Sequence, residues 1–274
     1  MERGDRLQLS SSFGAAAAAY AEHRPDYALN AVRWALELAP GPRVLDLGAG
    51  TGKLTAALVG LGGPRGLGGL SGRGGLGADI IAVEPDPAML AELRRALPGV
   101  RALPGSAEAI PLPDASVDAV LAGNAMHWFD MATAGPEIAR VLAPGGVLAG
   151  LWNVMDDRVD WVAGLERVSG SAAIGPRDTY RNWRSATAGM HLPGAGLADC
   201  FGSPEQAEFR HGQLRTAGSL TATLATRAGM LVMPAREQET TLARIRAFLA
   251  SRPETADGEF TLPLQTGVLR TRRL

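Results

Sequence analysis

The chain has 274 residues, of which 46% are hydrophobic, and this length and composition suit a globular protein with a sizeable core. Its formal net charge is −1 at pH 7, with 27 basic and 28 acidic residues, and the basic residues are scattered, which argues against a nucleic-acid-binding stripe. The single cysteine, Cys200, excludes an internal disulfide and a cysteine-based metal cage, and no apolar run approaches the roughly 18 residues that a membrane-spanning helix needs. We therefore expect a cytoplasmic protein that does not act in a membrane.

The first third of the chain predicts helix, strand and helix in that order. Residues 13–39 begin with an alanine run and place apolar side chains at helical spacing, although a proline must interrupt the helix. RVLDL, residues 43–47, predicts a buried strand, and KLTAALVGL, residues 53–61, predicts the helix that follows. Residues 60–77 include the glycine-rich run 62–77. We expect this whole segment to be a flexible surface insertion.

Strands and helices then alternate as far as residue 153, after which the pattern changes. Each predicted strand is almost wholly apolar, which is typical of a parallel sheet covered by helices on both faces. Residues 154–200 and 217–250 predict a partly helical cap on the substrate side. The remaining strands are predicted at 79–84, within 100–108 and 116–128, at 143–153, 206–216 and 260–273, and the remaining helices at 87–97 and 135–142.

Glycines alternate directly after the first strand, at Gly48, Gly50 and Gly52. In an open α/β sheet a ligand binds outside the carboxyl ends of the strands, and a residue without Cβ lets the backbone turn sharply and approach that ligand closely. The dinucleotide fingerprint needs its third glycine one residue later than it stands here. The spacing therefore favours another adenosine cofactor over a nicotinamide dinucleotide.

Two carboxylates flank these glycines at strand ends. Asp46 stands two residues before the first glycine, where its charge would repel phosphates and attract a cationic amino or sulfonium group. Glu84 ends the next strand, where a carboxylate can accept hydrogen bonds from both ribose hydroxyls. The two acids together favour a cationic nucleoside cofactor.

Four successive motifs resemble those of class I S-adenosylmethionine-dependent methyltransferases. They are VLDLGAGTGKLT, IIAVEPDPAMLAEL, GSAEAIPLPDASVDAVLAGNAMHWFD and ARVLAPGGVLAGLWN, in this order over residues 43–153. FGAAAAAYAEHRPDY and the terminal FTLPLQTGVLRTRR are similar to the small-molecule subgroup that includes trans-aconitate-type methyltransferases. The resemblance implies one Rossmann-like methyltransferase domain over residues 1–274, with its cofactor-binding core at 13–153 and a seven-stranded, mainly parallel sheet whose last strand is antiparallel.

The resemblance also implies which residues bind S-adenosylmethionine and its product S-adenosylhomocysteine. The first glycine motif and the end of the fourth strand would hold the methionine part of the cofactor, and Glu84 would hold the ribose. The loop after the third strand would border the adenine. The N-terminal helix would close over the carboxylate end of the cofactor. Ser106 stands where many relatives have aspartate, and Ala28 where the subgroup often has proline. The implied set is Tyr20, Arg24, Asp46, Gly48, Ala49, Gly50, Glu84, Pro85, Ser106, Ala107, Glu108, Asn124 and Ala125.

His127 is the candidate catalytic residue because it follows the fourth strand and histidine can take a proton near neutral pH. It can serve as a general base, position the acceptor, or hold the loop beside Trp128 and Phe129. The four histidines lack ligand spacing, so no metal is expected.

The expected activity is methyl transfer to an oxygen, nitrogen or carbon nucleophile of a small molecule, by a monomer or a homodimer. NAMH, residues 124–127, stands where enzymes that methylate nucleobase amines have Asn/Asp-Pro-Pro-aromatic, which argues against a nucleic-acid substrate. The alternatives are a cofactor-binding protein without transferase activity, such as a regulator or partner subunit, and, less favoured, a nicotinamide oxidoreductase.

Overall fold

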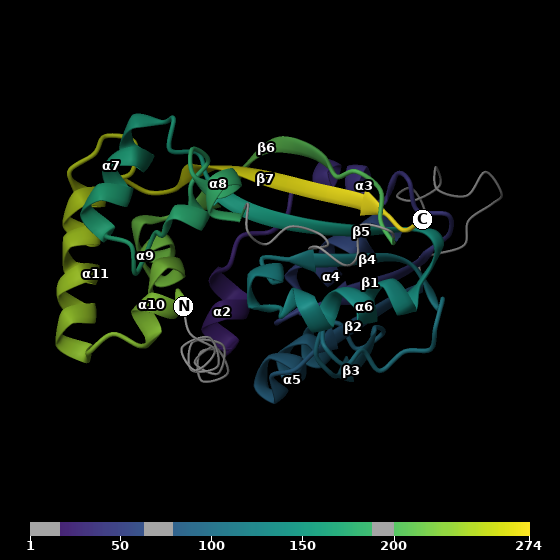
Figure 1. Cartoon of the computed structure of the whole chain (residues 1–274). Coiled ribbons are helices and arrows are strands. Elements are labelled where there is room, and N and C mark those ends of the chain that lie inside the picture. The colour runs from purple at the N-terminus through teal and green to yellow at the C-terminus, as the bar shows by residue number, and fades with distance from the viewer. Residues whose placement is uncertain (1–16, 63–78, 188–199) are drawn as a thin grey trace. The chain divides into compact units, whose positions relative to one another are not determined.

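A computed structural model describes residues 17–62, 79–187 and 200–274, apart from the side chain of Tyr20 (Figure 1). Contacts between residues divide the chain into two compact units. Unit 1 comprises Met1–Pro25, Asn153–Gly189 and Arg210–Gln265, and unit 2 comprises Asp26–Trp152, Met190–Phe209 and Thr266–Leu274. The prediction of one domain over residues 1–274 stays a prediction.

The strands form one seven-stranded sheet in the order β3-β2-β1-β4-β5-β7-β6 (Figure 1). Neighbours among the first five strands pair in parallel, and the last strand, β7, is antiparallel. The predicted fold is therefore confirmed. The strands are β1 (Arg43–Leu47), β2 (Asp79–Glu84), β3 (Arg101–Pro104), β4 (Val117–Gly123), β5 (Leu142–Met155), β6 (Glu205–Arg215) and β7 (Phe260–Arg272).

The topological switch point lies between β1 and β4. From β1 the chain moves by way of α4 and α5 to β2 and β3 on one side, whereas β4 and β5 follow on the other side. Loops at the carboxyl ends of β1 and β4 therefore border the crevice in which doubly wound sheets bind their ligands. The helices of unit 2 are α3 (Leu29–Leu36), α4 (Lys53–Gly62), α5 (Pro87–Ala96) and α6 (Met131–Val141), with a 3₁₀ turn, η2, at Met126–Trp128.

Apolar faces of α3 and α4 pack on the sheet of unit 2. Val32 and Leu36 of α3 and Leu54 and Leu58 of α4 join buried strand side chains such as Val44 in one hydrophobic cluster. Since successive strand residues face opposite sides, this packing fixes which strand residues point toward these two helices. The step from β4 to β5 runs across the sheet in the direction opposite to the step from β1 to β2. Because such crossovers are right-handed, α6 belongs to the face of the sheet opposite to α4.

Unit 1 has a hydrophobic cluster of its own. Leu165 of α7, Leu220 of α9 and Ile245 of α11 are fully buried in it, and the ring of Trp161 meets that of Phe260 edge-on at 5.6 Å between centroids. A partly helical cap was predicted for most of these residues. The described part of unit 1 contains the helices α2 (Ala17–His23), α7 (Asp160–Ser169), η3 (Pro176–Asp178), α8 (Trp183–Thr187), α9 (Ala217–Ala225), α10 (Ala228–Leu231) and α11 (Ala235–Ala250).

Several boundaries differ from the sequence predictions, and two of them bear on the glycine-rich segment and on the helix after β4. Helix α6 begins at Met131 rather than at residue 135, because the Asp130 carboxylate accepts the backbone N–H of Ala132 and caps the helix earlier. Helix α4 continues to Gly62, so residues 60–62 are helical although the glycine-rich insertion was expected to begin there. Residues 63–77 of that predicted insertion lie outside the described residues.

Candidate functional site

The loop after β1 has a backbone that requires glycine. Gly48, Gly50 and Gly52 have φ values of +69°, +58° and +89°, in the left-handed region that residues with a Cβ rarely adopt. A Cβ on Gly48 would lie 2.8 Å from the Cβ of Ala125, and one on Gly52 would lie 3.0 Å from the Cγ of Leu93. The three glycines thus allow the loop to pass between its neighbours, as their spacing predicted.

Glu84 ties this loop to the end of β2. One of its carboxylate oxygens accepts the N–H of Gly50 at 2.7 Å and the other accepts the N–H of Asp86 at 2.9 Å. The residue is only 6% exposed, and burial raises the pKa of its carboxyl while the two backbone N–H groups oppose that rise. Each carboxylate oxygen has a second lone pair, so Glu84 can still accept hydrogen bonds from a diol.

Asp46 is fully buried at the end of β1. Its Oδ2 accepts the hydroxyl of Thr55 at 2.6 Å, whereas its Oδ1 is buried and has no partner among the described residues. Burial raises the pKa of Asp46 to about 7, the Thr55 hydrogen bond opposes this, and the nearby charge of Glu84 adds to it. A buried acceptor without a partner is rare in a folded protein and points to a donor that comes from a ligand.

The loop after β3 lies against the start of α6. Ala107 is buried and Ser106 and Glu108 are partly exposed, with the Ser106 carbonyl accepting the N–H of Ala109 at 3.3 Å. The Glu108 carboxylate accepts the backbone N–H of Asp130 at 2.9 Å. Glu108 therefore connects the loop after β3 to the loop after β4.

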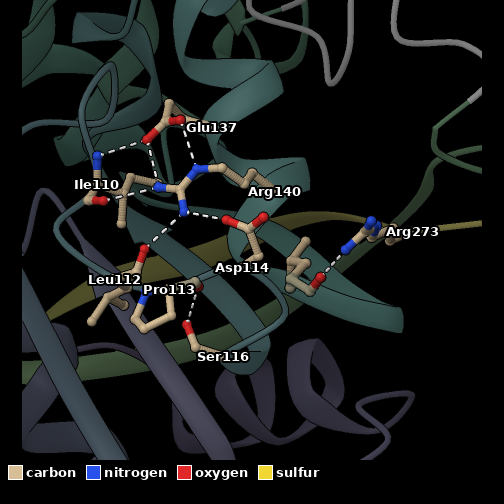
Figure 2. Close-up of polar contacts among 9 residues, drawn as sticks. Ile110, Leu112, Pro113, Asp114, Ser116, Glu137, Arg140 and Arg273 are labelled. Atoms are coloured by element: carbon tan, nitrogen blue, oxygen red, sulfur yellow. Dashed lines mark hydrogen bonds and ion pairs between the residues drawn. The ribbon is translucent and has the colours of Figure 1, made fainter.

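An arginine of α6 holds the rest of that loop in place, as Figure 2 shows. Arg140 donates to both carboxylate oxygens of Glu137 at 2.8 Å, to Asp114 at 2.8 Å and to the carbonyl oxygens of Ile110 and Leu112 at 3.0 and 2.8 Å. The same Glu137 accepts the N–H of Ile110 at 3.0 Å, and the Arg140 guanidinium lowers the pKa of the Glu137 carboxyl. These bonds fix the loop that carries the three residues expected to border adenine.

The end of β4 faces the glycine loop. Asn124 has a φ of +50° and donates its N–H to the Leu151 carbonyl of β5 at 2.8 Å. Ala125 is buried where its methyl group approaches Gly48. Asn124 and Ala125 thus lie at the carboxyl ends of the central strands, together with the residues that follow β1. Pro85, directly after Glu84, is exposed.

His127 lies in η2, just beyond β4. Its ring is partly buried, and its centroid lies 4.8 Å from that of the Trp128 ring. This contact accounts for part of the position of the His127 ring. The role of His127, as general base, as a group that positions the acceptor or as a structural group, stays a prediction.

Tyr20 and Arg24 belong to unit 1, whereas the other predicted site residues all belong to unit 2. Arg24 is buried and donates to the Thr226 carbonyl at 3.2 Å, which explains its position by a contact within unit 1. Their predicted contact with a cofactor stays a prediction. Among the described residues no group of three or more His, Cys, Asp or Glu side chains could hold a metal ion, and no helix is long and apolar enough to cross a membrane.

A methyltransferase domain model matches residues 45–150, which include the glycine loop, Glu84 and the end of β4. An uncharacterized methyltransferase of Mycobacterium tuberculosis is 40% identical over 266 residues, covering 97% of each chain. The chain belongs to the class I S-adenosylmethionine-dependent methyltransferases. Another uncharacterized methyltransferase, from Schizosaccharomyces pombe, is 34% identical over 194 residues, which are 70% of each chain.

The solved structures agree on the fold of this methyltransferase. A type II methyltransferase of Anaeromyxobacter dehalogenans superposes with a TM-score of 0.60 at 23% identity, covering 91% of this chain and 97% of that one. At this identity the likeness speaks for the fold alone.

Sequence reasoning missed two residues that shape this site in the methyltransferase. Thr55 bonds to Asp46, and a hydroxyl residue in the first turn of the helix after the glycine loop was the available signal. Arg140 organises the loop after β3, and its position three residues after Glu137 on one helix face indicated only their own ion pair.

Proposed function

We propose that this methyltransferase binds S-adenosylmethionine at the carboxyl ends of β1, β2 and β4 and transfers its methyl group to an oxygen, nitrogen or carbon nucleophile of a small molecule. Asp46, Gly48, Ala49 and Gly50 hold the methionine part of the cofactor in this proposal. The single observation that carries it is the unpartnered, buried Oδ1 of Asp46.

The chemistry of these residues fits such a cofactor. The unpartnered Oδ1 of Asp46 is suited to accept a hydrogen bond from an ammonium group, and the Oγ1 of Thr51 is likewise buried without a partner among the described residues. Glu84 presents a carboxylate for a ribose diol, already oriented by Gly50 and Asp86. A dinucleotide fits less well, because Asp46 would repel its phosphates.

S-adenosylmethionine would supply, when bound, a sulfonium methyl group whose carbon bonds to the acceptor nucleophile as its bond to sulfur breaks, leaving S-adenosylhomocysteine. The chain's own contribution is to fix the geometry: the left-handed glycines, the two carboxylates and the loop held by Arg140 are ordered by bonds within the protein. Alignment of reacting groups can supply roughly 7–11 kcal/mol of the barrier. A carboxylate acceptor needs no base, whereas for a hydroxyl acceptor His127 is our candidate to remove the proton.

Two features support a small-molecule acceptor. The net charge of −1 and the scattering of basic residues along the sequence argue against an extended basic stripe for a polyanion. NAMH also differs from the motif of enzymes that methylate nucleobase amines.

Calorimetric titration of the purified chain with S-adenosylmethionine, S-adenosylhomocysteine and NADH tests the proposal. We expect micromolar binding of both sulfur ligands, no binding of NADH, and at least a tenfold loss of affinity in Glu84→Ala. Glu92→Ala on α5 is the matched control, since Glu92 bonds only to the exposed Arg95 of its own helix, and it should bind as the wild type does. Binding of NADH alone would refute the assignment of the cofactor. Binding of both sulfur ligands without turnover across an acceptor screen would favour the protein without transferase activity.

A further inference from the structure

Two arginines of unit 1 lie close enough to repel each other and carry donors without an acceptor among the described residues. Arg177, in η3, is partly buried and makes no hydrogen bond or ion pair in the described part of the chain. Arg227, directly before α10, has a side chain only 12% exposed, and its buried Nε has no partner among the described residues. Buried donors of a charged group without an acceptor are rare in folded proteins.

Asp178 is the acid beside both arginines and does not satisfy them. Its Oδ1 receives Nη1 of Arg227 at 2.5 Å, and its Oδ2 receives the backbone N–H of Gly175 at 2.9 Å. Both oxygens are thus engaged, and neither bonds to Arg177. Two guanidinium groups lie near one carboxylate that bonds to Arg227 alone, which leaves a positive charge uncompensated within this cluster.

The environment makes this charge unfavourable for the protein alone. Burial lowers the pKa of Arg177, the charge of Asp178 opposes that effect, and the like charge of Arg227 adds to it. An anion between the guanidinium groups would remove the repulsion and accept the unused donors. Guanidinium forks match the geometry of carboxylate and phosphate groups and bind them with charge-assisted hydrogen bonds.

We propose that Arg177 and Arg227 form a binding site for an oxyanion, a carboxylate or phosphate group carried by a small molecule. The site belongs to unit 1 and uses none of the residues assigned to the cofactor. Asp178 holds the Arg227 guanidinium in place, and Arg177, the more loosely held of the two, closes on the ligand.

The experiment measures anion binding by calorimetry to the full chain saturated with S-adenosylhomocysteine, using inorganic phosphate, succinate and the neutral dimethyl ester of succinate as probes. We expect saturable binding of at least one anion and none of the ester. Arg177→Gln should weaken anion binding about tenfold, because it removes a fork of charge-assisted donors. Its melting temperature should not fall, because Arg177 makes no bond that the substitution breaks. A preference for phosphate or succinate then identifies which oxyanion the physiological ligand presents.

Arg236→Gln is the matched control, since Arg236 is an exposed arginine of the same unit, on α11. It should leave anion affinity unchanged. An equal loss in both variants would show attraction by the overall charge and overturn the proposal, as would equal binding of the ester or no saturable anion binding. A tenfold loss of S-adenosylhomocysteine affinity in Arg177→Gln would assign the arginines to the cofactor and also overturn it. Failure of the cofactor to bind the wild type would instead refute the proposed function, so the two failures are distinguishable.

Discussion

The buried carboxyl of Asp46 makes the affinity for S-adenosylmethionine depend on pH. With a pKa of about 7, the group is roughly 9% ionised at pH 6 and roughly 91% ionised at pH 8. A cationic ligand binds the ionised form, lowers the pKa of Asp46 and releases a proton below pH 7. The affinity should therefore rise about tenfold from pH 6 to pH 8 and level off above, since the ionised fraction changes by that factor.

Calorimetry in two buffers of different ionisation enthalpy measures both the affinity and the released proton. Asp46→Asn keeps the size of the side chain and removes its titration, so its affinity should be low and independent of pH. Glu84→Gln is a necessary second variant, because the pKa of Glu84 is also raised and its charge acts on Asp46. An equal rise in wild type and Asp46→Asn, or a flat profile in the wild type, would refute the assignment of Asp46.

Three further predictions concern stability. Without cofactor, the folded-state pKa of Asp46 lies above its unfolded value of about 3.9, so the contribution of Asp46 to the free energy of unfolding falls as pH rises from about 4 to about 7. The difference in free energy of unfolding between wild type and Asp46→Asn, measured in urea, should fall over the same pH range. A difference that stays constant with pH would contradict this prediction. Gly48→Ala should destabilise the chain by about 2–3 kcal/mol, since φ is +69° and the new Cβ would lie 2.8 Å from the Cβ of Ala125. The control Gly60→Ala, in a helix with open space around it, should be neutral or stabilising. Equal changes in melting temperature in the two variants would contradict the backbone requirement for glycine at position 48. Arg140→Ala should cost about 2 kcal/mol in urea unfolding and weaken S-adenosylhomocysteine binding, whereas Arg95→Ala, which loses one exposed ion pair, should leave stability nearly unchanged. Unaltered binding in Arg140→Ala would separate the loop from the cofactor.

The sequence alone predicted the order of the main strands and helices and the glycine loop on which the proposed site depends. The mainly apolar runs RVLDL and DIIAVE correspond residue for residue to β1 and β2, because a strand buried on both faces has a nearly continuous apolar sequence instead of an alternating one. The glycine spacing indicated a sharp turn after β1, and the positive φ values of the three glycines are consistent with it, since backbone freedom is a local property of each residue. Local capping was less visible, and the start of α6 was placed four residues too late.

Only the tertiary structure decided how the site's groups are charged and held. The bond from Gly50 to Glu84 spans 34 residues and depends on the register between β1 and β2. The pKa of Asp46 follows from complete burial next to Thr55, and neither burial nor that bond can be read from a motif. Arg177 and Arg227 are 50 residues apart in the sequence, so their proximity to each other and to Asp178 appears only after the chain has folded. Periodicity and backbone preference are properties of neighbouring residues, whereas electrostatics depends on distances in space that the fold alone sets.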